Sequence, residues 1–205
     1  MIAIIDYGVG NLFSLKSSFA AIGEKATVTD DRAVIASADR VILPGVGAFG
    51  DAVDKLRERD LFGFVQEQAL SGKPFLGICL GMQMLFESSL EFGYHEGLGL
   101  IPGQVRPIDG VIPQGLDIPH MGWNRLDFTD KNAPGSLFAE LPEESYVYFV
   151  HSYAAFGCGE YLTASAEYGV PLTAAVQRGN IYGTQFHPEK SGETGLAILR
   201  AFAAL

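Results

Sequence analysis

The chain has 205 residues, 48% of them hydrophobic, and a formal net charge of −10 at pH 7. Its length and hydrophobic content predict one α/β domain, residues 1–205, with a sizeable core, while the negative charge and the lack of a basic stripe argue against a nucleic-acid partner. No apolar run is long enough to span a membrane, and the first five residues have the pattern of a strand instead of a signal peptide, so a cytoplasmic protein is expected.

The first half of the chain alternates apolar strands with amphipathic helices. Strands are expected near residues 2–6 and 41–43, and helices near 12–22, 48–58 and 61–70. Such alternation is typical of parallel βαβ units with right-handed crossovers. We therefore predict an open, mostly parallel sheet flanked by helices.

A glycine-rich turn, Pro44-Gly45-Val46-Gly47, follows the second of these strands. In acyl transfer a backbone N–H must point at the developing oxyanion, and glycine permits the peptide conformations that this requires. Because a glycine-rich turn after a strand is usually only a loop, this signal is weak alone.

The next apolar run, residues 75–78, leads directly to Cys79. The cysteine lies between Gly77 and Gly81, and helix-like sequence follows at residues 82–86. This is the pattern of a nucleophile elbow, in which glycines leave room for a strained turn and a helix N-terminus beside the sulfur favours the thiolate. The alternative is a buried core cysteine.

The second half of the chain changes character. From about residue 97 to 177 it is rich in Gly, Pro and aromatic residues, with short strand-like runs such as 145–150. We expect an antiparallel excursion here, before a strand at residues 181–186 returns the chain to the main sheet. The last helix is expected over residues 195–203, with Ser191 as a candidate cap.

A candidate base, His187-Pro188-Glu189, follows the strand at residues 181–186. A cysteine nucleophile requires an imidazole within hydrogen-bond reach, and the imidazole requires an acceptor that fixes its tautomer. Because Pro188 restricts the backbone, the Glu189 carboxylate can be held beside the ring. A surface loop with an incidental His and Glu is the alternative. The rival histidines, His120 and His151, have no carboxylate two residues on.

Taken together, the Cys79 and His187 segments resemble the class I, or triad, glutamine amidotransferases. The resemblance implies the fold of that family and a reaction in which Cys79 attacks the side-chain amide of glutamine, His187 shuttles the proton and Glu189 orients His187. It also implies that the oxyanion site is built from the backbone of Gly45, Val46, Gly47 and Leu80.

The same resemblance implies a glutamine pocket. By position after the nucleophile, Gln83 and Glu91 match residues that line this pocket in the family, and the segment His151-Ser152-Tyr153 is expected to contact the carboxylate end of glutamine. Gln83 lies one helical turn beyond Cys79 and can share its site. For Glu91, a solvated charge in a loop remains the alternative.

Within the family, Pro44–Gly47 and the segments at residues 6–12, 119–124 and 148–153 are similar to those of glutaminase subunits of imidazole glycerol phosphate synthase. The similarity implies a heterodimer with a TIM-barrel cyclase subunit, which uses the ammonia to convert PRFAR into imidazole glycerol phosphate and AICAR in histidine biosynthesis. The candidates for the partner interface are Asn11, Trp123, Tyr148 and Lys190. For Trp123 the alternative is a buried core residue.

Other assignments stay open from the sequence alone. They are the glutaminase of another synthase, a non-amidotransferase cysteine hydrolase, and an inactive partner-binding module. No Cys/His spacing resembles a zinc site, and Gly8-Val9-Gly10 lacks the third glycine of a dinucleotide loop, so neither a metal nor a cofactor is expected. Cys79 and Cys158 are expected to be reduced.

Overall fold

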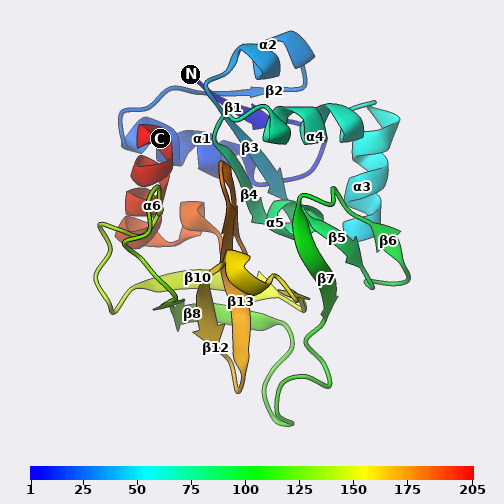
Figure 1. Cartoon of the computed structure of the whole chain (residues 1–205), viewed down its shortest axis with the longest axis vertical. Coiled ribbons are helices and arrows are strands. Elements are labelled where there is room, and N and C mark those ends of the chain that lie inside the picture. Colours follow the sequence, from blue (N-terminus) through cyan, green and yellow to red (C-terminus); the bar gives the residue numbers. More distant parts are fainter.

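The computed structural model describes residues 1–205, and a central eight-stranded sheet organises it, with helices on both faces (Figure 1). The strand order is β2-β1-β3-β4-β14-β13-β12-β9. The parallel part comprises β1 (Ile2–Ile5), β2 (Ala26–Thr29), β3 (Arg40–Gly45), β4 (Phe75–Cys79) and β14 (Ile181–Thr184). The antiparallel extension comprises β13 (Pro171–Arg178), β12 (Leu162–Glu167) and β9 (Asp127–Phe128).

Two smaller sheets come from the middle of the chain, where the sequence predicts an antiparallel excursion. One has the order β11-β7-β5-β6 and contains β5 (Phe86–Ser89), β6 (His95–Glu96), β7 (Ile101–Pro107) and β11 (Tyr153–Phe156). The other pairs β8 (His120–Arg125) with β10 (Tyr146–His151) in antiparallel register. The excursion is confirmed, although β5 and β7 run parallel.

Six α-helices and two 3₁₀ turns complete the chain. The helices are α1 (Leu12–Ala21), α2 (Arg32–Ser37), α3 (Phe49–Glu58), α4 (Phe62–Leu70), α5 (Leu80–Met84) and α6 (Gly192–Ala204), and the 3₁₀ turns are η1 (Gly159–Tyr161) and η2 (Pro188–Lys190). None of the helices is both long and apolar enough to cross a membrane.

The alternation of side chains along the parallel strands divides the core into two layers. In β1, Ile2 and Ile4 pack in one cluster with α1 and α6, whereas Ala3 and Ile5 pack in the other with α3 and α4. Both layers are closed because a parallel sheet buries its two faces under the crossover helices. The predicted fold class is confirmed.

Sheet order brings three distant segments to one edge. Gly45 at the end of β3 pairs with Cys79 at the end of β4, and Ile78 pairs with Thr184 at the end of β14. The carboxyl ends of parallel strands are where open α/β sheets build their sites. The glycine-rich turn, the candidate nucleophile and the segment that carries the candidate base therefore meet at the same edge.

Several sequence expectations need correction. The helix after Cys79 begins at Leu80 and ends at Met84, so residue 86 belongs to β5 and not to the helix, because Phe86 pairs with Ile101 of β7. The strand expected to reach residue 186 ends at Thr184, where its neighbour β4 turns away. The last helix begins earlier than expected, at Gly192, and β2 and α2 were not predicted.

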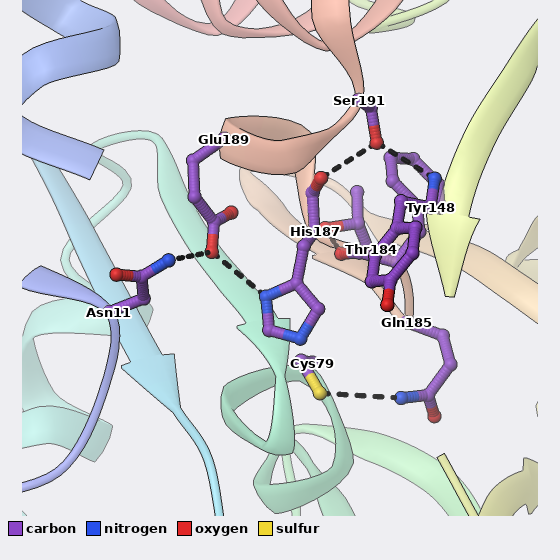
Figure 2. A network of polar contacts seen from close by, with 9 residues as sticks. Asn11, Cys79, Tyr148, Thr184, Gln185, His187, Glu189 and Ser191 are labelled. Atoms are coloured by element: carbon purple, nitrogen blue, oxygen red, sulfur yellow. Dashed lines mark hydrogen bonds and ion pairs between the residues drawn. The ribbon is translucent and has the colours of Figure 1, made fainter. Parts of the chain in front are cut away.

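Ser191 precedes the last helix, but its hydroxyl does not cap it. Its Oγ donates to the carbonyl oxygen of His187 at 2.7 Å and accepts from the backbone N–H of Tyr148 at 3.0 Å (Figure 2). The side chain thus ties the backbone of His187 to β10, which fixes the segment that carries the candidate base.

Candidate active site

Cys79 occupies a strained turn between β4 and α5. Its backbone has φ 55° and ψ −111°, a conformation that L-residues rarely adopt, and the residue is 7% exposed. The turn also requires a very close approach of two backbones, because a Cβ on Gly81 would lie 1.9 Å from the carbonyl oxygen of Leu43. The structure therefore has the nucleophile elbow that the Gly77–Gly81 spacing predicts.

His187 lies between Cys79 and Glu189 (Figure 2). Its Nδ1 is 2.8 Å from Oε1 of Glu189, and the same oxygen accepts a hydrogen bond from Nδ2 of Asn11 at 3.4 Å. Because an ionised carboxylate only accepts, Nδ1 carries the proton, and the other ring nitrogen points toward Cys79. The histidine thus links the predicted nucleophile to the predicted orienting carboxylate.

The electrostatics of His187 favour the imidazolium. Burial acts to lower the pKa of His187, but its hydrogen bonds and charge interactions with Cys79 and Glu189 outweigh burial and raise the pKa above its ordinary value. The histidine and glutamate side chains are only 3% and 1% exposed, so solvent screens these interactions little. The positive charge of this imidazolium therefore lies beside the sulfur of the predicted nucleophile.

A cavity of about 400 Å³ opens onto the sulfur. Its walls include Cys79, His187 and the predicted oxyanion and glutamine-binding residues Val46, Gly47, Leu80, Gln83, Glu91, His151, Ser152 and Tyr153. Three further lining residues, Phe92, Pro119 and Val150, were not predicted from the sequence. A cavity of this size accommodates a small amino acid with the nucleophile at one wall.

Glu91 is buried, at 8% exposure, so the solvated-loop alternative is wrong. Its Oε2 accepts a short hydrogen bond, 2.6 Å, from the backbone N–H of Phe49 at the start of α3. Burial raises the pKa of Glu91, and the hydrogen bond from Phe49 works in the opposite direction. The carboxylate lies at the cavity wall, in a position to receive a cationic group.

Gln83 and Tyr153 are linked to a residue that was not predicted, Gln185. Nε2 of Gln83 donates to the carbonyl oxygen of Tyr153 at 3.0 Å and to Oε1 of Gln185 at 2.9 Å. Nε2 of Gln185 in turn donates to Sγ of Cys79 at 3.8 Å (Figure 2). The only sequence signal for Gln185 was its place two residues before His187.

The rival histidines, His120 and His151, form a hydrogen bond with each other. Nε2 of His151 lies 3.0 Å from Nδ1 of His120, and Nδ1 of His151 lies 2.8 Å from the carbonyl oxygen of Tyr153. Burial lowers the pKa of both imidazoles to about 4, so both are neutral near pH 7. Neither forms a hydrogen bond with Cys79, which leaves His187 as the candidate base.

The glycine-rich turn is held by Tyr7, which lies two residues after β1 and for which the sequence predicted no individual role. The hydroxyl of Tyr7 donates to the carbonyl oxygen of Pro44 at 2.7 Å, and burial, followed by the charge of Cys79, raises the pKa of Tyr7. Gly45 ends β3 and does not line the cavity, whereas Gly47 lines it with φ 95°. The oxyanion role of Gly45, Val46, Gly47 and Leu80 stays a prediction.

The candidate interface residues lie close to the candidate triad. Asn11 contacts Glu189, and Lys190 places its Nζ 5.9 Å from the ring centre of Tyr148. Trp123 pairs with Tyr148 across β8 and β10, with ring centres 6.2 Å apart. Because Trp123 is 58% exposed, the alternative of a buried core residue is wrong.

The structure shows neither a cluster of metal-ligating side chains nor a disulfide bond. No group of three or more His, Cys, Asp or Glu side chains is placed to hold a metal ion. Cys79 and Cys158 are both free and buried, and Cys158 has only a weak 4.0 Å contact with Oγ1 of Thr173.

Known proteins resemble this chain over almost its whole length. The family model described as glutamine amidotransferase class-I matches residues 3–204. The chain is 50% identical over 203 residues to the imidazole glycerol phosphate synthase subunit HisH of Oceanobacillus iheyensis, covering 98% of each chain. It is 51% identical over 205 residues to the protein of the same name from Sulfurimonas denitrificans, covering 98% of this chain and 97% of that one.

A solved structure gives the same fold at lower identity. PurLQS from Thermotoga maritima superposes with a TM-score of 0.75 and 20% identity, covering 99% of this chain and 97% of that chain. At this identity the likeness shows the architecture alone, and it agrees with the sheet and helix arrangement described above.

Proposed function

The chain belongs to the class-I glutamine amidotransferase family, and from that premise we propose that it is the glutaminase subunit of an imidazole glycerol phosphate synthase. It hydrolyses glutamine to glutamate and ammonia. The observation that carries this proposal is the order Cys79, His187, Glu189 at the end of a cavity of about 400 Å³, with the cysteine on a strained elbow.

In the proposed reaction, the Cys79 thiolate attacks the carboxamide carbon of glutamine. The electron pair of the C=O bond moves to oxygen, where backbone N–H groups of the Gly45–Gly47 turn and of Leu80 receive the charge. The intermediate collapses as His187 protonates the leaving nitrogen, so that ammonia departs and a glutamyl thioester remains. A water molecule, deprotonated by His187, then attacks the thioester and releases glutamate and the thiolate.

The walls of the cavity suit the two ends of glutamine. The buried Glu91 carboxylate pairs with the substrate ammonium, since a buried anion gains most from a cationic partner. The segment His151–Tyr153 lies at the cavity and receives the substrate carboxylate through backbone N–H and hydroxyl groups. Together these contacts hold the side-chain amide over Cys79.

The ammonia is consumed by a second chain, a TIM-barrel cyclase subunit, which converts PRFAR into imidazole glycerol phosphate and AICAR in histidine biosynthesis. The partner binds at the surface formed by Asn11, Trp123, Tyr148 and Lys190. The names of the relatives and the exposed Trp123, which pairs with Tyr148, support this assignment. We further propose that residues 1–205 form one amidotransferase domain and that the heterodimer is cytoplasmic.

A glutamine analogue with an electrophilic carbon in place of the amide tests the site and substrate together. We expect intact-mass spectrometry to show one adduct, localised to Cys79, that forms in the wild-type chain and is slowed by free glutamine. Cys79→Ala should form none, and Cys158→Ala should react as the wild type does. An adduct on another residue, or no competition by glutamine, would contradict the proposal.

A further inference from the structure

Gln185 contacts the sulfur of Cys79, and the reaction above assigns it no role. The side chain is fully buried, and its Nε2 lies 3.8 Å from Sγ of Cys79 (Figure 2). An N–H donor at a sulfur stabilises the thiolate more than the thiol, because hydrogen bonds to a charged acceptor are the stronger ones. What matters is therefore whether the nitrogen, and not the oxygen, of this amide faces the sulfur.

The hydrogen bonds around Gln83 impose that orientation. The carbonyl oxygen of Tyr153 can only accept, so the nitrogen of Gln83 must lie toward it, at 3.0 Å. The second N–H on that nitrogen reaches the side chain of Gln185 at 2.9 Å, and only the oxygen of Gln185 can accept it. The nitrogen of Gln185 is consequently left for Cys79.

A series of hydrogen bonds also connects the Tyr153 carbonyl oxygen to Asn124 on strand β8. His151 must carry its proton on Nδ1 to donate to the Tyr153 carbonyl oxygen, so its Nε2 accepts from Nδ1 of His120. Nε2 of His120 then accepts from Nδ2 of Asn124, at 3.2 Å, and the other N–H of that amide goes to the carbonyl oxygen of Glu167. All the hydrogen bonds in this series are satisfied if His120 and His151 are both neutral and both carry their proton on Nδ1.

We propose that Gln185 is a further catalytic residue, whose amide N–H stabilises the Cys79 thiolate. Three positioning residues support it: Gln83 fixes the direction of this amide, and His151 and His120 hold the Tyr153 carbonyl oxygen that Gln83 contacts. The inference rests on the proposed glutaminase function. In the first step the N–H stabilises the attacking thiolate. In the second step the C–S bond breaks, its electron pair returns to sulfur, and the same N–H receives the leaving thiolate.

Alkylation by iodoacetamide, measured against pH in the absence of glutamine, tests the role of Gln185 directly. The experiment uses a Cys158→Ala background so that Cys79 is the only thiol. In Gln185→Leu we expect the pH midpoint of alkylation to rise by about one unit, a tenfold loss of rate on the acidic side that corresponds to about 1.4 kcal/mol. Gln185→Glu should raise it further, because a carboxylate repels the thiolate.

The matched control is Gln177→Leu, which removes a glutamine amide of β13 that contacts Gly179 and Tyr182 and not the sulfur. Its alkylation profile should equal that of the parent. All variants retain the two titratable groups that face the sulfur, His187 and Tyr7. A Gln185→Leu profile equal to the control overturns the inference and leaves the glutaminase proposal intact. Absence of glutaminase activity in the wild-type complex overturns the function, whatever the alkylation profile.

Two substitutions of His120 separate positioning from packing. His120→Phe keeps a ring stacked between Phe149 and Tyr168, at centroid distances of 4.8 and 4.1 Å, but donates no hydrogen bond. His120→Asn gives up the ring and keeps an N–H near the Nδ1 position. We expect the Phe variant to shift the alkylation midpoint in the direction of Gln185→Leu and the Asn variant to shift it less. The reverse order overturns the positioning role.

A second measurement needs no variant to fold. Long-range proton–nitrogen NMR spectra of the ¹⁵N-histidine-labelled chain at pH 7 distinguish the two neutral tautomers. We expect His120 and His151 both to be protonated on Nδ1. An Nε2–H tautomer at either histidine would be incompatible with the series of hydrogen bonds from Asn124 to the Tyr153 carbonyl oxygen, and would overturn the role of the two histidines.

Discussion

Replacement of Glu189 by glutamine isolates the charge in the candidate triad. The amide oxygen of the new side chain can still accept from Nδ1 of His187 and from Nδ2 of Asn11, so the geometry of the 2.8 Å contact is retained. Oε2 of Glu189 has no hydrogen-bond partner, and an NH₂ group in its place breaks no existing contact. The substitution therefore removes a negative charge beside a buried imidazole and little else.

The size of the effect follows from that contact. A hydrogen bond to a charged group contributes about 1.5–3 kcal/mol, and a neutral one about 1 kcal/mol. Because His187 and Glu189 are 3% and 1% exposed, solvent does not reduce the difference. The difference, about 0.5–2 kcal/mol, corresponds to a fall of roughly 2- to 30-fold in kcat/KM.

The assay is glutamate release by the complex with a cyclase subunit, with kcat/KM measured from pH 6 to pH 10 or above. Glu189 helps to raise the pKa of His187, so the alkaline limb that reports loss of the imidazolium should move to lower pH in Glu189→Gln. The exposed Glu193→Gln, on the next helix, is the matched control. A loss as complete as that of Cys79→Ala, or one below about twofold, would refute the view that Glu189 orients and charges the histidine.

Three further predictions concern the nucleophile, the elbow and the buried histidine pair. Cys79→Ala should abolish glutamate release while the cyclase reaction of the complex persists with added ammonium salt, and loss of both would contradict the division of labour. Gly81→Ala should lower the free energy of unfolding by about 2 kcal/mol or more in urea titration, because its Cβ meets the Leu43 carbonyl oxygen, whereas Gly63→Ala, with open space around it, should not. The free energy of unfolding should also fall as pH drops from 6.5 to about 4, because the unfolded chain binds protons that the buried His120 and His151 of the folded chain exclude. His120→Asn should flatten this acid limb, and an unchanged slope would show that the buried pair is not its source.

The candidate triad was predictable because its parts lie in two short motifs whose positions the topology fixes. Cys79 follows a buried strand directly, and His187 follows another, so a parallel sheet that places β4 beside β14 brings them together. The glycines flanking Cys79 mark the elbow because no other residue fits where Gly81 meets the backbone of β3. Each motif alone left a structural alternative open, and the roles of Cys79, His187 and Glu189 followed from the resemblance of the two motifs together to a known family.

The surrounding polar network was not predictable in the same way. The contact between Gln185 and Cys79 joins residues 106 positions apart, and that between Gln83 and Gln185 spans 102 positions. Nothing in the local sequence indicates which buried amide faces which, since the direction follows from a carbonyl oxygen on β11. For Ser191 the local sequence was misleading. Serine is typical of helix N-caps, but this side chain links the backbones of His187 and Tyr148 instead.

The measurement that tests the central claim most directly is glutamate release from glutamine by the purified chain, alone and then with a TIM-barrel cyclase subunit and its sugar-phosphate ligand. The account predicts strong stimulation by the loaded partner and no release by Cys79→Ala under either condition. Full activity that is indifferent to that partner would contradict the synthase assignment, and absence of glutamate under both conditions would contradict the glutaminase itself.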